Sequence, residues 1–93
     1  MEIKVYATLR DIVGNHSVRL EDAAEMNVDQ ILQQLFAKHP ELRSKLLDND
    51  GRLNPTFHIF INGRNVQYLN GLETIVTTAD DVRIFPPVGG GRR

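Results

Sequence analysis

The residues of this chain whose types and spacing suggest chemistry lie at its C-terminal end, from Phe85 to Arg93. Pro86 and Pro87 follow an apolar run typical of a strand, and they must end it, because proline has no N–H to donate and its ring fixes φ. The glycines at positions 89–91 then add backbone without side-chain width. At about 3.3 Å per residue, the segment from position 86 to 91 reaches roughly 20 Å. A stiff spacer with a thin tip is suited to placing a chain end in another protein's narrow active site.

The segment Phe85-Pro86-Pro87-Val88-Gly89-Gly90-Gly91 resembles a known family ending. The small subunit of molybdopterin synthase (MoaD) and its ubiquitin-like relatives end in an apolar residue followed by Pro-Pro-Val-x-Gly-Gly, and the thiamine sulfur carrier (ThiS) ends in a similar diglycine. Here Gly89 takes the variable position and Gly90-Gly91 is the diglycine. Glycine runs end many chains, so the specific part of the resemblance is the Phe-Pro-Pro-Val run before them. The chain departs from the pattern at one point, because Arg92-Arg93 follow the second glycine.

The resemblance implies a sulfur carrier that acts as a co-substrate and is not itself an enzyme. A partner adenylating enzyme of the E1 type would use ATP to activate the carboxylate of Gly91, next to Gly90, and a sulfur donor would then leave a thiocarboxylate there. A protease would first have to remove Arg92-Arg93. The chain itself is expected to bind no cofactor and no metal, and the large subunit of molybdopterin synthase is a further candidate partner.

Two other functions stay open at this point. The same activated glycine could be joined to lysine amines of target proteins, as ubiquitin is, in place of sulfur transfer or beside it. The chain could also be a binding domain of the same fold that is never conjugated, in which Arg92-Arg93 would be permanent. A glycine-rich end without function is the alternative interpretation of the tail, and the Phe-Pro-Pro-Val run argues against it.

Length and composition predict one domain with one modest core, because the chain has 93 residues, of which 41% are hydrophobic and 25% charged. A net charge of −1 argues against nucleic-acid binding, which usually needs a basic surface. There is no cysteine, so any sulfur must be carried by the C-terminal carboxylate. No apolar run approaches about 18 residues and no signal peptide is apparent, so we expect a cytoplasmic protein that does not enter a membrane.

The elements that must position the tail begin with an alternating segment over residues 1–9, which predicts a half-buried strand. Gly14-Asn15 predicts a turn within residues 11–16, and residues 17–20 alternate again, so the first two strands should form a hairpin. The inward face of the first strand is expected to carry Ile3, Val5, Ala7 and Leu9.

Residues 27–39 form the one long helical pattern of the chain. Asn27 is a good N-cap and Gln30 follows three residues later, as in a capping box. Pro40 ends this helix and can start a shorter helical piece, whose apolar side is Leu42, Leu46 and Leu47. A single apolar stripe runs along the main helix at positions Val28, Ile31, Leu32, Leu35 and Phe36.

Residues 57–61 form a β-prone run, and Asn62-Gly63 directly after it predicts a type I′ hairpin turn. Residues 64–67 should be the returning strand, residues 70–73 an irregular turn or a 3₁₀ piece, and residues 82–85 the last strand. The order predicts an α+β fold in which one helix covers one face of a four- or five-stranded sheet. Periodicity alone leaves ferredoxin-like half-folds open.

The resemblance implies a β-grasp (ubiquitin-like) fold for residues 1–85, with the first and last strands parallel and adjacent at the centre of the sheet. Residues 86–93 would form a flexible tail. If the β-branched residues of the strands face the helix, then Tyr6, Phe60 and Phe85 face the other way. Three aromatics on that face predict a docking patch for a partner, continued by Pro86, Pro87, Val88 and Gly89; chance exposure or a twist of the strand register is the alternative. The three histidines lack metal-ligand spacing and are interpreted as surface or turn residues.

Overall fold

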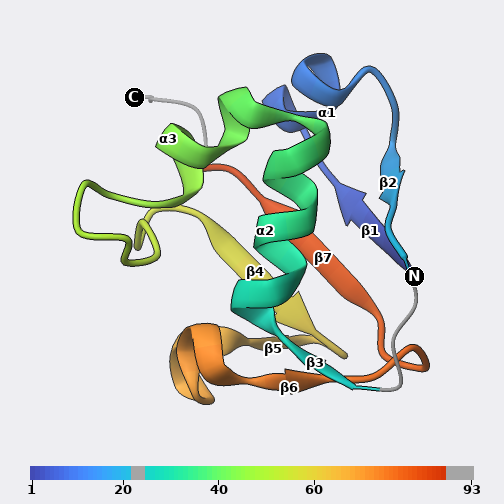
Figure 1. The fold of residues 1–93 in the computed structure, drawn as a ribbon, viewed down its shortest axis with the longest axis vertical. Helices are drawn as coiled ribbons and strands as arrows, with labels where there is room; N and C mark the ends of the chain where they lie inside the picture. The colour runs from blue at the N-terminus through green and yellow to red at the C-terminus, as the bar shows by residue number, and fades with distance from the viewer. Residues whose placement is uncertain (22–24, 88–93) are drawn as a thin grey trace.

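The computed structural model of the chain describes residues 1–21 and 25–87. Its centre is a mixed five-stranded sheet in which β1 and β7 run parallel and the other neighbours run antiparallel (Figure 1). Across the sheet the strands follow the order β2 (Ser17–Arg19), β1 (Glu2–Val5), β7 (Val82–Phe85), β4 (His58–Ile61) and β5 (Arg64–Asn65). The last strand therefore lies at the centre, next to the first, as predicted.

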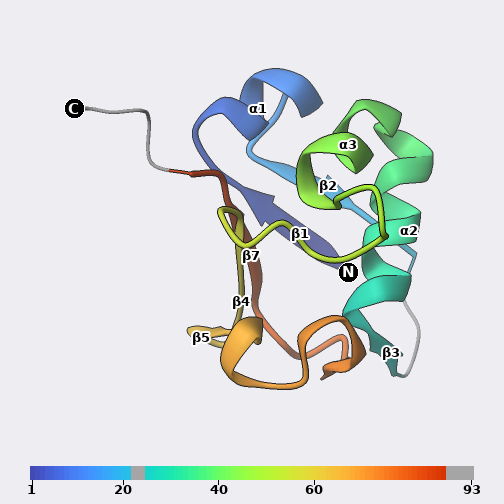
Figure 2. The same cartoon turned by 90° about the vertical axis from the view of Figure 1, so that its left-hand side faces the viewer.

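The helix α2 (Val28–Lys38) covers one face of this sheet, and Figure 2 shows the opposite face free of helices along β1, β7 and β4. The predicted capping box is present, because Asn27 Oδ1 accepts the backbone N–H of Gln30 at 2.8 Å and Gln30 Oε1 accepts that of Asn27 at 2.9 Å. The predicted apolar stripe of α2 is buried, together with the inward residues Ile3, Val5, Ile59, Val82 and Ile84. This is the β-grasp fold.

Shorter elements connect the main ones. After α2 the chain forms η1 (Pro40–Leu42) and α3 (Arg43–Leu46), and the predicted apolar residues of this piece are buried. After β5 come η2 (Val66–Tyr68) and η3 (Gly71–Glu73). A second, two-stranded sheet pairs β3 (Met26–Asn27) with β6 (Ile75–Val76), and the sequence patterns did not predict it.

The prediction for residues 6–13 was wrong, whereas the turn predicted at Gly14-Asn15 is present between α1 and β2. β1 ends at Val5, and the helix α1 (Thr8–Val13) replaces the end of the predicted strand and the first part of the predicted turn. Leu9 is buried as expected, but it reaches the core from α1 together with Ile12 and Val13, whose i, i+3, i+4 spacing is helical. Ala7 was expected to face inward and is exposed, with a φ of 53° at the point where strand becomes helix.

The second hairpin follows the prediction in its turn but not in its length. Asn62 and Gly63 both have positive φ, 52° and 84°, as a type I′ turn requires. The returning strand was predicted to reach residue 67, but it ends at Asn65. The reason is local, because Asn65 Oδ1 accepts the backbone N–H of Gln67 at 2.9 Å and starts η2.

Candidate functional site

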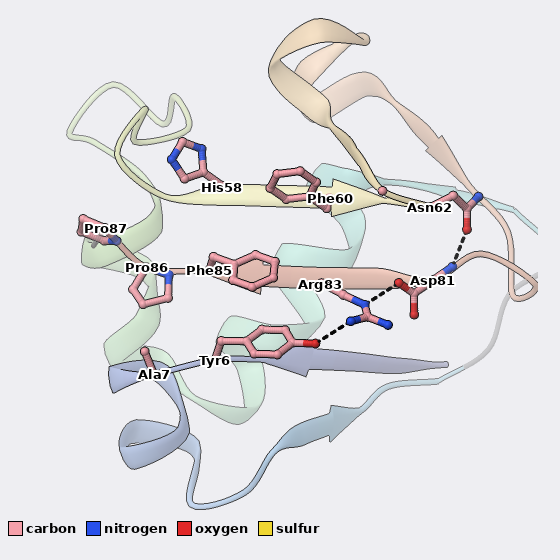
Figure 3. Close-up of a pocket in the computed structure, with 11 residues that line it drawn as sticks. Tyr6, Ala7, His58, Phe60, Asn62, Asp81, Arg83, Phe85, Pro86 and Pro87 are labelled. Carbon is pink, nitrogen blue, oxygen red and sulfur yellow. Dashed lines mark hydrogen bonds and ion pairs between the residues drawn. The ribbon is translucent and has the colours of Figure 1, made fainter. Parts of the chain in front are cut away.

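The face of the sheet away from α2 carries a row of ring side chains in contact with one another (Figure 3). Phe85 stacks on Tyr6, with ring centroids 4.3 Å apart and planes 7° from parallel. Phe60 meets Phe85 edge to face at 5.6 Å, and His58 lies 6.5 Å from Phe60 in a similar arrangement. We call Tyr6, Phe85, Phe60 and His58 the aromatic row. The three aromatics share one face, as strand alternation predicted, while their role in docking stays a prediction.

Strand pairing explains why these rings meet. Ile84 is buried between its partners Val5 and Ile59, so the next residue of β7, Phe85, must point to the opposite face. His58 lies directly opposite Phe85 on β4. Aromatic rings at adjacent positions of neighbouring strands are within contact distance, so the row extends from Tyr6, directly after β1, across β7 to β4.

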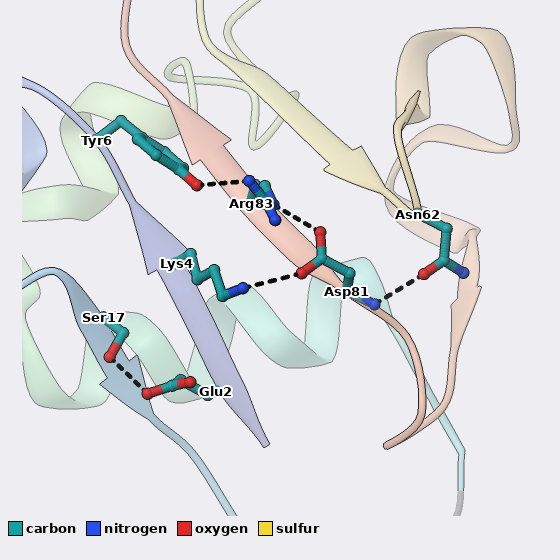
Figure 4. Close-up of polar contacts among 7 residues, drawn as sticks. All are labelled: Glu2, Lys4, Tyr6, Ser17, Asn62, Asp81 and Arg83. Carbon is teal, nitrogen blue, oxygen red and sulfur yellow. Dashed lines mark hydrogen bonds and ion pairs between the residues drawn. The ribbon is translucent and has the colours of Figure 1, made fainter.

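A chain of polar contacts fixes the outer edge of Tyr6 (Figure 4). Arg83 Nη1 donates a hydrogen bond to the Tyr6 hydroxyl at 2.9 Å, and Arg83 Nε donates to Asp81 Oδ2 at 2.6 Å. Lys4 Nζ lies 3.3 Å from the other carboxylate oxygen of Asp81. The hydrogen bond from Arg83, and after it the contact with Lys4, holds the pKa of Asp81 below its usual value. The carboxylate therefore stays ionised and orients both cations.

Hydrogen bonds connect Asn62, in the turn between β4 and β5, to the residues directly before β7. Asn62 Oδ1 accepts the backbone N–H of Asp81, and the Asn62 N–H donates to the Asp81 carbonyl, both at 2.8 Å. Asn62 Nδ2 also donates to Asp80 Oδ1 at 2.9 Å. The pKa of Asp80 is lowered, first by the backbone N–H of Thr77 and then by Asn62. These contacts hold β4 and β7 in register beneath the rings.

The root of the C-terminal tail lies in a groove beside the aromatic row. The groove has a volume of about 890 Å³, which is room for several side chains of a partner, and Tyr6, His58, Phe85, Pro86 and Pro87 are among its lining residues. Pro86 is buried and Pro87 is exposed. The two prolines were predicted to end the last strand, and β7 ends at Phe85, directly before Pro86.

The reacting end predicted from the sequence lies outside the part of the chain that the structure describes. The predicted site residues Gly90 and Gly91 lie outside the described residues, as do Val88, Gly89 and Arg92-Arg93. The structure thus defines the surface around Pro86 and Pro87, from which the tail starts. The diglycine of the tail is known from the sequence alone.

Three side chains of this site were missed in the sequence. Arg83 and His58 occupy the same alternating positions as Phe85 and Phe60, so the alternation that selected the aromatics also contained their signal. Arg10 belongs to the unpredicted helix α1. Its guanidinium lies 4.9 Å from the centre of the Tyr6 ring, a cation–π distance, and its Nε donates to the Val5 carbonyl at 2.9 Å.

Within residues 1–21 and 25–87, no group of histidine, cysteine or carboxylate side chains is arranged to hold a metal ion. In the same part of the chain, no helix has the length and apolar character needed to span a bilayer.

The mixed sheet, the main helix and the last strand at the centre define a ubiquitin-like protein of β-grasp type. Its last described residues, Pro86 and Pro87, lie beside an aromatic surface. Comparison with known proteins gives the family. The ThiS family model matches residues 3–91, so the chain belongs to the ThiS family of ubiquitin-like proteins.

Similar proteins in this family are modifiers and sulfur carriers. The chain is 37% identical to small archaeal modifier protein 3 of Haloferax volcanii, over 98% of each chain. It is 30% identical to the sulfur carrier protein CysO of Mycobacterium tuberculosis over 63 residues, which are 66% of this chain and 68% of that protein.

Solved structures show the same fold. The crystal structure of SAMP1 from H. volcanii has a TM-score of 0.83 and 30% identity, covering 97% of both chains. A chain in the crystal structure of the BexX/CysO complex from Amycolatopsis orientalis has a TM-score of 0.81 and 25% identity, covering 97% of this chain and 98% of that one. The protein is therefore a member of a family of sulfur carriers and small modifiers.

Proposed function

We propose that this protein carries sulfur as a thiocarboxylate on Gly91, once a protease has removed Arg92-Arg93. One observation carries the proposal: the ThiS match ends at residue 91, the second glycine of the motif, and leaves out the two arginines. The position of the tail also supports the proposal, because the tail starts from the central strand β7 beside the aromatic row, to which a partner can bind.

The chemistry needs a free carboxylate at Gly91. In the full-length chain this carbonyl belongs to a peptide bond, whose resonance makes it a poor reactant. After cleavage, a carboxylate oxygen of Gly91 attacks the α-phosphorus of ATP and pyrophosphate leaves, which gives an acyl-adenylate. Sulfur from a sulfide donor then attacks the carbonyl carbon, AMP leaves, and the thiocarboxylate remains. The adenylating enzyme supplies the nucleotide site and its electrostatics, while this chain supplies the reacting end.

The docking surface in this proposal is the aromatic row together with Pro86 and Pro87, continued by Val88 and Gly89. Its rings are half-buried, preorganised by stacking and flanked by fixed charges, and such residues commonly dominate interface energies. A relative of similar fold was solved in complex with BexX, which supports partner binding by this type of domain. We assign the surface to an E1-type adenylating enzyme; the large subunit of molybdopterin synthase is a candidate for the later acceptor.

A second function has its own support. The 37% identity with small archaeal modifier protein 3, over almost the whole of both chains, favours conjugation to proteins. In that reaction the amine nitrogen of a target lysine attacks the same acyl-adenylate carbon, AMP leaves, and an isopeptide bond forms. The two functions share the activation step and differ in the nucleophile.

The test compares three proteins: the full-length chain, the chain ending at Gly91, and that shorter chain with Gly91→Ala. With the adenylating enzyme and ATP, the shorter chain should support pyrophosphate exchange and gain the mass of an oxygen-to-sulfur replacement. The full-length chain should react poorly, and Gly91→Ala should impair the reaction, because a Cβ adds width at the reacting residue. Equal activity of the full-length and shorter chains would show that processing is unnecessary. No activity of either would favour a binding domain that is not conjugated.

A further inference from the structure

The hydrogen bonds of Asn65 fix the orientation of its side-chain amide. Asn65 Oδ1 is 2.9 Å from the backbone nitrogen of Gln67 at the start of η2. A backbone N–H can only donate, so the atom that faces it must be the amide oxygen. The amide nitrogen, Nδ2, is consequently the atom that faces His58, at 3.0 Å from its Nδ1.

This orientation determines the tautomer of the neutral His58 ring. The Asn65 Nδ2 group has only hydrogens to offer, so His58 Nδ1 must accept and cannot carry a proton. A neutral imidazole with a bare Nδ1 has its hydrogen on Nε2. Of the two neutral tautomers of His58, the contact with Asn65 therefore selects the Nε2–H form.

His58 stands at the tail root. It lies opposite Phe85 in the register of β4 and β7, and it lines the groove that also holds Pro86 and Pro87. The polar side chains on the other side of this groove bond to one another: Arg83 to Tyr6 and Asp81, and Asn62 to Asp80. Among residues 1–21 and 25–87, His58 Nε2 has no hydrogen-bond partner. The Nε2–H group of His58 is therefore a hydrogen-bond donor that lies beside an apolar surface and can bind an acceptor of a partner.

We propose that His58 is a specificity-determining residue of the docking surface: Nε2–H donates a hydrogen bond to a carbonyl or carboxylate oxygen of the adenylating enzyme, and Asn65 positions it. The enzyme is the occupant because Pro86 and Pro87 line the same groove, so the protein that takes up the chain end must cover His58. A donor buried beside rings without an acceptor would weaken the complex, so the contact selects partners that supply an oxygen there. The identity of this partner rests on the proposed function; the tautomer does not.

The tautomer is tested on the free protein, by the ¹⁵N chemical shifts of the His58 ring. The wild type should show a protonated Nε2 and an unprotonated Nδ1. Asn65→Asp keeps an oxygen for the Gln67 N–H and turns the other oxygen, an acceptor, toward Nδ1, so it should move a proton onto Nδ1. A protonated Nδ1 in the wild type, or an Asn65→Asp spectrum like that of the wild type, would overturn the assignment.

The contact is tested by the affinity of the full-length chain and two His58 variants for the adenylating enzyme. Glutamine reaches the position of Nε2 with an N–H, whereas asparagine reaches only the position of Nδ1. His58→Asn should weaken binding about fivefold to tenfold, the worth of one neutral hydrogen bond, and His58→Gln should stay within about twofold to threefold of the wild type. Equal binding of the wild type and His58→Asn, or equal losses in the two variants, would overturn the proposal.

Phe85→Ala separates this proposal from the one on which it rests. If Phe85→Ala weakens binding and His58→Asn does not, the docking surface stands and the His58 contact is wrong. If neither variant changes the affinity and the chain ending at Gly91 is not adenylated, the proposed function fails and the His58 contact fails with it.

Discussion

Phe85→Ala tests whether one face of the sheet forms the core and the opposite face forms the docking surface. Phe85 packs on Tyr6 and Phe60 on the face away from α2, so its loss leaves the core on the other face intact. Each aromatic contact contributes about 0.5–1.5 kcal/mol beyond burial of area, so losing both should lower the free energy of unfolding by about 1–3 kcal/mol, in addition to the apolar area that the half-buried ring loses. Because a domain of this kind is stable by about 5–15 kcal/mol, the variant should stay folded.

Phe85→Ala should also weaken binding to the adenylating enzyme. Removal of a central aromatic from an interface commonly costs more than about 1 kcal/mol, so the Kd for the adenylating enzyme should rise more than about fivefold. Urea denaturation gives the stability of the free protein and titration calorimetry gives the Kd. Tyr68→Ala is the matched control, because Tyr68 is 84% exposed and lies outside the aromatic row, and it should change neither quantity by much.

Two results would refute the reasoning. A folded Phe85→Ala variant with an unchanged Kd would show that the aromatic row is not the docking surface. A variant that is unfolded at 25 °C would show that Phe85 belongs to the core.

Three further predictions concern stability. Leu35 is fully buried on α2, so Leu35→Ala should lower the free energy of unfolding by about 2–5 kcal/mol in urea, against little change for Gln33→Ala on the exposed face; a loss below about 0.5 kcal/mol would contradict the core assignment. Ala7 has a φ of 53°, so Ala7→Gly should raise the free energy of unfolding by about 1 kcal/mol, and a lower melting temperature would contradict this. The folded-state pKa of Asp81 is lowered from an ordinary value of 3.8. Ionised Asp81 therefore contributes to the free energy of unfolding above that pH, and this contribution is lost as the pH falls through the folded-state pKa. This contribution of Asp81 to the free energy of unfolding should be small, because Asp81 and its partners are partly exposed. Asp81→Asn should make the urea midpoint less dependent on pH on the acid side. An unchanged dependence would contradict the assignment.

Those parts of the fold with strong local signals were predictable. The helix α2 combines an apolar stripe at helical spacing with a capping box, and both signals point to the same start of the helix. Asn62-Gly63 likewise specifies its turn, because both residues tolerate positive φ. Here local chemistry and tertiary packing agree, so periodicity was sufficient.

The segment after β1 was not predictable in this way. Leu9 continues the alternation of the first strand, but it also starts the helical spacing that Ile12 and Val13 complete. The chain resolves this ambiguity at Ala7, whose positive φ turns the strand into α1. Glycine is the residue that signals such a conformation, so alanine at this position conceals the boundary.

The site was predictable in its rings and not in its polar contacts. Strand alternation placed Tyr6, Phe60 and Phe85 on one face without knowledge of which strands pair. The hydrogen bond from Arg83 to Tyr6 joins residues 77 positions apart, and it exists because β1 and β7 are parallel neighbours in a particular register. The contact of His58 with Asn65 depends in the same way on the early end of β5.

The central position of β7 links the core to the direction of the tail. β7 is hydrogen-bonded to β1 on one side and to β4 on the other, so its end cannot fray as an edge strand does. A slip of one residue would turn Phe85 into the core and Ile84 onto the surface, and every inward residue of β7 would be lost from the core at once. The pairing that buries Ile84 therefore also fixes Phe85 and the point from which Pro86 starts. Changes that loosen the core beneath β7 should consequently impair presentation of the chain end, even where they lie far from the tail.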